Sequence, residues 1–137
     1  MVEMLRAFVE ERTPLNRALG LRLVATAPGE ATCLLPYAPA LVGDAETGAV
    51  HGGAITTLVD VTCGSAACMK MARLRRIVTL ELRIDHLRPS RSGKDLAARA
   101  ECYELTPSVA FVRGLVHDGD AADAVATMQA TYMLVEE

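Results

Sequence analysis

The chain contains no tryptophan, and only two phenylalanines and three tyrosines supply aromatic rings besides its three histidines. No uncharged apolar run approaches the roughly 20 residues that a membrane-spanning helix needs. Basic residues are not in excess either, because 14 Lys and Arg stand against 17 Asp and Glu and leave a formal charge of -3. The first residues carry Glu3, Glu10 and Glu11 among apolar ones, which is untypical of a signal peptide or an anchor. We therefore expect neither a membrane protein nor a partner of nucleic acid.

The four cysteines, Cys33, Cys63, Cys68 and Cys102, form no CxxC pair, and the histidines are scattered. Neither zinc-ligand spacing nor a redox motif is present, so we predict no metal site. Disulfides are typical of small secreted domains, whereas this chain is long enough to be stable on a hydrophobic core. Free thiols in a cytoplasmic location are expected.

A single domain over residues 1–137 is predicted, because the length suits one domain and 51% of the residues are hydrophobic. Residues 2–12 have the spacing of a short amphipathic helix. A hairpin is predicted over residues 21–35, with its turn at residues 27–29. After a glycine-rich loop at residues 43–53, residues 54–72 are apolar or small on nearly every side, which indicates a central helix.

Four further strands are predicted after this helix. Residues 79–89 alternate, with Leu80, Leu82 and Ile84 on one face and charged residues on the other. Turn residues then separate strands within residues 96–105, 109–118 and 124–135 at hairpin spacing. The pattern predicts an α+β fold in which an antiparallel sheet of five to six strands wraps around one long central helix. This arrangement is the hotdog architecture, with a short N-terminal helix added.

Asp60 is the first candidate for chemistry, because it lies among Leu58, Val59 and Val61 in the central helix. Removing an ionised carboxylate from water costs several kcal/mol unless something compensates it. Two interpretations are open: Asp60 lies on a wet stripe or pairs with an arginine such as Arg83 or Arg88, or it acts as a nucleophile or general base.

Gly52 and Gly53 precede the helix, where the first backbone N–H groups lack intrahelical acceptors. Glycine lets a ligand approach the backbone, so the Gly52 amide could form an oxyanion hole, although such glycines are often only turn residues. Gly52 and Asp60 are eight residues apart, or roughly 12 Å along a helix. One reacting carbon cannot contact both in one chain, and we therefore expect a site shared between two-fold-related subunits.

His51 precedes the two glycines and could act as a base. The favoured interpretation is that its ring holds the loop by hydrogen bonding. Met69 and Met71 are interpreted as packing residues rather than part of a cofactor site.

The run GAVHGGAITTLVDVTCGSAA, followed by TLELRIDHLRPS and a glycine, resembles the PaaI-type branch of hotdog acyl-CoA thioesterases. The resemblance implies hydrolysis of an acyl-CoA, with no metal and with coenzyme A entering only as part of the substrate. It further implies homodimers whose sheets join edge to edge, and usually a dimer of dimers. Asp60 would attack the thioester or activate water, the Gly52 amide of the other subunit would polarise the carbonyl, and Thr79 would help to position water.

The same resemblance suggests the substrate-binding residues, which we take to be His51, Gly53, Asp44, Arg88, Arg91 and Lys94. The last three cluster after the strand that contains Thr79 and would bind the coenzyme A phosphates, or would only form a solvated turn. The family often has asparagine six residues before the histidine, where this chain has Ala45 beside Asp44. Asp44 could take over its role, but a second carboxylate near Asp60 would raise the pKa of one of them.

Two alternatives to the thioesterase are a non-catalytic acyl-CoA-binding hotdog protein and a hotdog dehydratase. The dehydratase would need a histidine acting with an acidic residue across the site, for which His51 is badly placed. The acyl group of the substrate is left open by the sequence.

Overall fold

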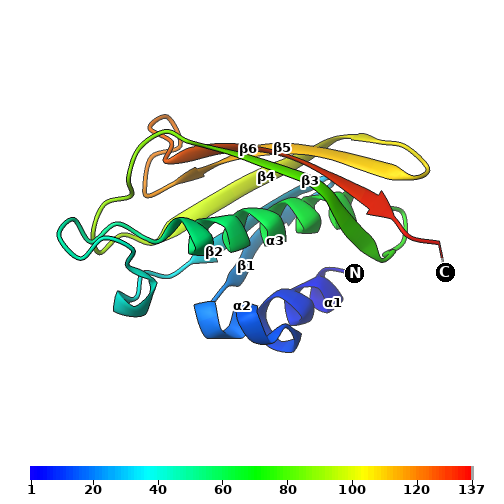
Figure 1. Ribbon diagram of the computed structural model, residues 1–137. Helices are drawn as coiled ribbons and strands as arrows, with labels where there is room; N and C mark the ends of the chain where they lie inside the picture. Colours follow the sequence, from blue (N-terminus) through cyan, green and yellow to red (C-terminus); the bar gives the residue numbers. More distant parts are fainter. Residues whose placement is uncertain (137) are drawn as a thin grey trace.

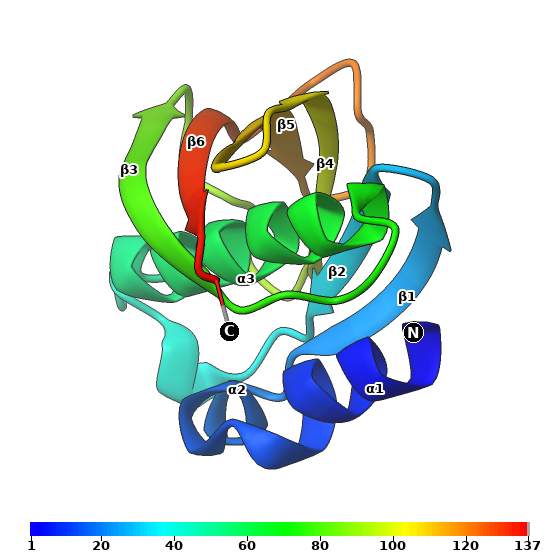
Figure 2. The same ribbon diagram turned by 90° about the vertical axis from the view of Figure 1, so that its right-hand side faces the viewer.

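The computed structural model describes residues 1–136, which fold into a curled sheet around one long helix (Figures 1 and 2). The strands are β1 (Arg22–Ala27), β2 (Glu30–Leu35), β3 (Ile77–His86), β4 (Leu96–Leu105), β5 (Val109–His117) and β6 (Ala126–Leu134). They form one antiparallel sheet in the order β1-β2-β4-β5-β6-β3. The predicted hotdog fold is confirmed.

Helix α3 (Gly52–Lys70) lies in the concave face of this sheet, as Figure 2 shows. Its residues 62–68 are all buried, which explains why the sequence is apolar or small on nearly every side. The helix begins and ends two residues earlier than predicted. No helix within residues 1–136 combines the length and the apolar character needed to cross a bilayer.

The N-terminal segment is longer than the predicted single helix. Helix α1 (Val2–Ala7) continues into a π-helical turn, Phe8–Arg12, and a second short helix, α2 (Pro14–Leu19), follows. Pro14 suits the first position of α2 because its missing N–H would have no helical acceptor there. Gly20 ends the helix with a φ of 73°, a conformation that glycine adopts without strain.

Strand β3 occupies a different place from the one predicted. The turn residues around Gly93 indicated a hairpin between β3 and β4. Instead, β3 is an edge strand of the sheet and pairs with β6, two strands away from β4. The alternating pattern of β3 sets which face is buried and carries no information about its partner strand. Within residues 1–136, the other edge of β3 is unpaired, so this ten-residue strand ends the sheet.

The expected alternation along β3 is also wrong at one residue. The register with β6 shifts between Thr79, opposite Tyr132, and Glu81, opposite Thr131. Leu80 is the extra residue of this bulge and is 50% exposed instead of facing the helix with Leu82 and Ile84. The bulge turns Thr79 toward the helix, and it therefore bears directly on the site described below.

The loop between β2 and α3 is ordered by backbone contacts, as its glycines suggested. The Gly43 N–H donates to the Ala49 carbonyl at 2.8 Å, and the His51 N–H donates to the Leu41 carbonyl at 2.7 Å. Gly48 has a φ of 74° and packs directly against Ser92, so a side chain at position 48 would have neither a favourable conformation nor room. This loop delivers the chain to the start of α3.

Candidate active site

Asp60 lies in the middle of α3 and is held by two hydroxyl groups from the sheet. Thr79 Oγ1 donates to Asp60 Oδ1 at 3.0 Å, and the Tyr132 hydroxyl lies 3.0 Å from the same oxygen. The Tyr132 hydroxyl is also 2.9 Å from the Asp60 carbonyl oxygen. Among residues 1–136, no group donates to Oδ2, so one carboxylate oxygen is fixed and the other is free to react.

Of the two structural alternatives for Asp60, the pairing with an arginine is not seen within residues 1–136, whereas the residue does lie on the less buried side of α3 with Thr57 and Val61. Arg83 pairs with Asp85 at 3.3 Å, and Arg88 pairs with Asp118 at 2.7 Å. Asp60 is partly buried and so keeps access to solvent. The two hydroxyls orient the carboxylate without adding a positive charge beside it, as a base or nucleophile requires.

The sheet register explains how both hydroxyls reach one oxygen. Thr79 and Tyr132 are direct partners across the β3–β6 ladder, and the bulge after Thr79 keeps both side chains on the helix side. Tyr132 is 2% exposed, and burial is the main cause that raises the pKa of its phenol. The hydroxyl therefore keeps its proton and donates throughout the ordinary pH range.

Sequence reasoning missed Tyr132. Its one signal was a tyrosine at an inward-facing position of a predicted strand, since a buried tyrosine hydroxyl usually has a polar partner. Which partner it has depends on β3 pairing with β6, which the sequence did not predict.

The start of α3 presents backbone donors, as expected. His51 is the N-cap, and its Nδ1 accepts from the Gly53 N–H at 2.9 Å, which confirms that the ring holds the loop. The Gly53 amide is therefore occupied within the chain. The Gly52 N–H has no acceptor within residues 1–136, and a Cβ built on Gly52 would meet nothing within 4 Å.

A pocket of about 450 Å³ opens beside Gly52. Its wall is mostly apolar and consists of Ala49, Val50, Gly52, Ile55, His86, Leu87, Arg88, Pro89 and Ser90. The free amide thus lies at the edge of a cavity with room for part of a ligand. A larger hollow of about 700 Å³ lies among charged residues of the sheet, and neither Gly52 nor Asp60 lines it.

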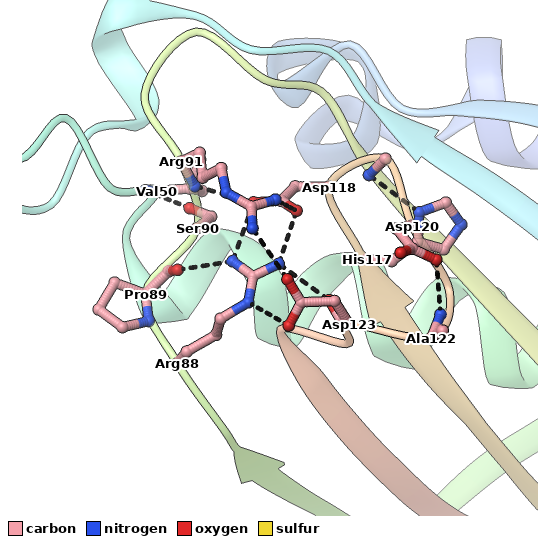
Figure 3. Close-up of polar contacts among 11 residues, drawn as sticks. Val50, Arg88, Pro89, Ser90, Arg91, His117, Asp118, Asp120, Ala122 and Asp123 are labelled. Carbon is pink, nitrogen blue, oxygen red and sulfur yellow. Dashed lines mark hydrogen bonds and ion pairs between the residues drawn. The ribbon is translucent and has the colours of Figure 1, made fainter.

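Arg88 and Arg91 are engaged with two carboxylates of the β5–β6 loop, as Figure 3 shows. Arg88 donates to both oxygens of Asp118, at 2.7 and 3.1 Å, and through Nε to Asp123 at 3.1 Å. Arg91 donates to Asp118 at 3.1 Å and to Asp123 at 2.8 Å. The Arg88 side chain is 22% exposed and that of Asp118 is 0% exposed. The solvated turn, which was the alternative to a phosphate site for these arginines, is instead an ion-pair network. Lys94 is exposed and has no ion pair within the described residues.

Asp44 is exposed and stabilises its own loop. Its Oδ1 accepts from the Glu46 N–H at 3.0 Å, and its carbonyl oxygen accepts from the Gly48 N–H at 2.7 Å. The Glu46 and Thr47 donors lower the pKa of Asp44. A raised pKa was expected for one of two neighbouring carboxylates, and the pKa of Asp44 is not raised within one chain.

The cysteines do not supply a nucleophile in this site. All four are buried and free, and burial raises the pKa of Cys63 to about 12 and those of Cys33 and Cys68 to about 11. These thiols stay protonated near neutral pH, whereas the thiolate is the reactive form.

Comparison with known proteins places this geometry in a family. Residues 47–125, which include Gly52, Asp60 and Thr79, match the family described as "Thioesterase superfamily". The chain belongs to the thioesterase superfamily. It is similar to YigI of Salmonella typhimurium, a medium/long-chain acyl-CoA thioesterase, with 32% identity over 135 residues that cover 88% of this chain and 85% of the relative.

Solved structures agree with the family. A Pseudomonas aeruginosa protein is 38% identical, covers 97% of this chain and 98% of its own, and has a TM-score of 0.87. A mutant of the phenylacetic acid degradation protein PaaI from Thermus thermophilus is 28% identical over 90% of this chain and 100% of its own, with a TM-score of 0.77. The chain is thus a PaaI-type hotdog thioesterase, an enzyme that hydrolyses thioesters.

Proposed function

We propose that this thioesterase hydrolyses acyl-CoA at Asp60, with the Gly52 amide of a second subunit as oxyanion donor. The observation that carries the proposal is the carboxylate of Asp60, which is oriented by Thr79 and Tyr132 through one oxygen and free at the other. An oriented carboxylate near a partly open surface is suited to removing a proton from water or to attacking a carbonyl carbon.

The chemistry requires a charge-stabilising group for the thioester oxygen. Water, or the Asp60 carboxylate itself, adds to the carbonyl carbon, and the negative charge that develops on the oxygen is stabilised by the Gly52 N–H at the positive end of α3. The C–S bond then breaks, and coenzyme A leaves as a thiolate that takes up a proton. On the nucleophilic route, water subsequently hydrolyses the acyl–Asp60 anhydride to restore the carboxylate.

The two groups are proposed to come from different subunits. Gly52 and Asp60 belong to one continuous α-helix, so about 12 Å of helix separates them in a single chain. The unpaired edge of β3 carries Thr79, and an exposed edge strand of this length favours pairing with a second copy. A two-fold axis beside β3 would then set the Gly52 amide of one protomer opposite Asp60 of its partner, and such dimers could pair further into a dimer of dimers.

The substrate is proposed to be a medium- or long-chain acyl-CoA, the class named for the YigI relatives. The pocket beside Gly52 supports this proposal because Val50, Ile55, Leu87 and Pro89 give it an apolar wall. His51 could orient the thioester: its Nδ1 accepts from Gly53, so the neutral ring carries its proton on Nε2. Lys94 and the exposed part of Arg91 are the cations that remain to bind the coenzyme A phosphates. We also expect the enzyme to act in the cytoplasm.

The test is thiol release from aliphatic acyl-CoAs of graded length and from phenylacetyl-CoA and hydroxybenzoyl-CoA, with Asp60→Asn beside the wild type. Asn keeps the size of the side chain but cannot remove a proton or attack efficiently, so we expect kcat to fall by about 10²- to 10⁴-fold. Circular dichroism and Tm serve as the control for folding. Wild-type turnover by a folded Asp60→Asn variant would remove Asp60 from the mechanism.

A further inference from the structure

The ion-pair network between the β5–β6 loop and the turn after β3 is connected to the start of α3 through one buried serine. Ser90 lies between Arg88 and Arg91 and is 5% exposed. Its Oγ accepts from the Val50 N–H at 3.0 Å, inside the protein. Figure 3 shows this contact beside the two arginines and their carboxylates.

The turn that carries Ser90 is fixed from both sides. Asp118 accepts from both Arg88 and Arg91 and also from the Arg91 backbone N–H at 2.9 Å. Arg88 donates further to the Pro89 carbonyl at 3.0 Å and to the Asp123 carbonyl at 2.8 Å. Two guanidinium groups and two carboxylates cancel in charge, so this network suits the holding of backbone better than the attraction of an anion.

Val50 is two residues before Gly52 and pairs with Val42 in a β-bridge, so Ser90 is one of several groups that hold this segment. The His51 N–H donates to Leu41 and its ring accepts from Gly53, while Val50 is anchored by Ser90. Val50, Gly52, Arg88, Pro89 and Ser90 all line the pocket of about 450 Å³. Ser90 contributes the side-chain anchor of this segment, which links the position of Val50, and through it the direction of the Gly52 N–H, to the turn after β3.

We propose that Ser90, held in place by Asp118 through Arg88 and Arg91, is a positioning residue that aims the Gly52 amide at the thioester oxygen. This inference rests on the proposed function of Gly52. An oxyanion donor must point at the place where charge develops. A small displacement of such a donor therefore reduces the stabilisation of the transition state more than it reduces the binding of the substrate. Loss of Ser90 is therefore expected to lower kcat with little change in KM.

The first variants to compare are Ser90→Ala, which removes the acceptor of the Val50 N–H, and Ser90→Thr, which keeps a hydroxyl. We expect Ser90→Ala to lower kcat about tenfold with KM within about twofold of the wild type, and Ser90→Thr to recover most of the loss. The matched control is Ser92→Ala in the same turn, because Ser92 contacts the Tyr37 hydroxyl and not Val50. It is expected to leave kcat unchanged.

The deciding measurement repeats Ser90→Ala in a Gly52→Pro background. Proline lacks the N–H and is best tolerated at the first helical position, where Gly52 lies, and the ψ of 136° at His51 suits a residue before proline. If Ser90 acts through the Gly52 amide, then Ser90→Ala changes kcat by less than about twofold once that amide is gone.

An equal tenfold loss in both backgrounds, or no loss in either, would overturn the role of Ser90. A folded Gly52→Pro variant with wild-type kcat would instead contradict the oxyanion site, so the two failures are distinguishable. If Ser90→Ala does not fold, Asp118→Asn tests the same link from the other end of the network. Asp120→Asn is its control, because the Asp120 side chain accepts from the Ala122 N–H in its own loop and from no other group of residues 1–136. A folded Asp118→Asn variant with unchanged kcat would overturn the proposal.

Discussion

The hydroxyl of Tyr132 is the contact that distinguishes Asp60 from an ordinary helical aspartate. It reaches the partly buried carboxylate from a strand that is 72 residues away in the sequence, and Tyr132 itself is buried. Two donors on one oxygen leave the carboxylate a single preferred orientation, with Oδ2 directed away from Thr79 and Tyr132. Orientation of this kind is worth most to a group that must meet a reacting atom at close range.

Removal of that hydroxyl should therefore slow the reaction without unfolding the enzyme. We expect Tyr132→Phe to lower kcat about tenfold, because the ring still fills its buried site while the carboxylate loses one of its two donors. The measurement is kcat for acyl-CoA hydrolysis, with Tyr103→Phe as control because Tyr103 is 45% exposed and packs near Phe111. Equal kcat values for Tyr132→Phe and Tyr103→Phe would show that Tyr132 does not orient Asp60.

Other residues of the site show what a sequence can and cannot predict. Asp60 stood out because a carboxylate among apolar neighbours needs a reason, and His51 because it precedes a helix; both interpretations depend on neighbours in sequence. Arg88 was expected to bind a phosphate. Its ion pairs could not be foreseen, because its partners Asp118 and Asp123 are 30 and 35 residues away in the sequence. Nothing local indicates that its charge is already matched.

At the scale of elements, the fold was predictable wherever periodicity decides it. The positions of α3, β4, β5 and β6 follow from the lengths and phases of apolar runs. The pairing of β3 with β6 and the bulge after Thr79 could not be predicted, because both depend on contacts with a strand that comes some 50 residues later. These two features are the ones that bring Thr79 and Tyr132 together.

The loop between β5 and β6 is joined to the turn after β3 mainly by Asp118. The Arg88 guanidinium is the main cause that holds the pKa of Asp118 well below its ordinary value of 3.8. A depressed pKa means that the folded state favours the charged form, so the stabilisation is fully present above about pH 5 and is lost as the pH falls toward the folded-state pKa.

We expect Asp118→Asn to lower the free energy of unfolding by about 2 to 3 kcal/mol at pH 7, because two arginines lose a buried carboxylate partner. The difference from the wild type should be constant between about pH 5 and 7 and should shrink below about pH 4. Urea denaturation at a series of pH values measures it, with Asp120→Asn as control. A difference that stayed constant down to pH 2.5 would show that the loss comes from packing and not from charge.

At the scale of the whole molecule, the two groups of the proposed site lie apart on one helix of a single chain. The free Gly52 amide lies at one end of α3, and Asp60 with its hydroxyl donors lies about two turns further along the same helix. β3, whose outer edge is unpaired within residues 1–136, contacts Asp60 through Thr79, and this edge is where we propose that the second subunit binds. An antiparallel two-fold pairing there would produce two equivalent sites in each dimer.

The most direct test of this shared site is complementation between two severely impaired chains, Asp60→Ala and Gly52→Pro, that are unfolded together, refolded as a mixture and assayed for thiol release. Random mixing makes half of the dimers mixed, and each mixed dimer has one intact site of two, so we predict recovery of about a quarter of the wild-type activity. Each variant refolded alone should keep no more than about 1% of the wild-type activity. Mixed dimers that are verified by mass spectrometry and yet hydrolyse no acyl-CoA would contradict the account.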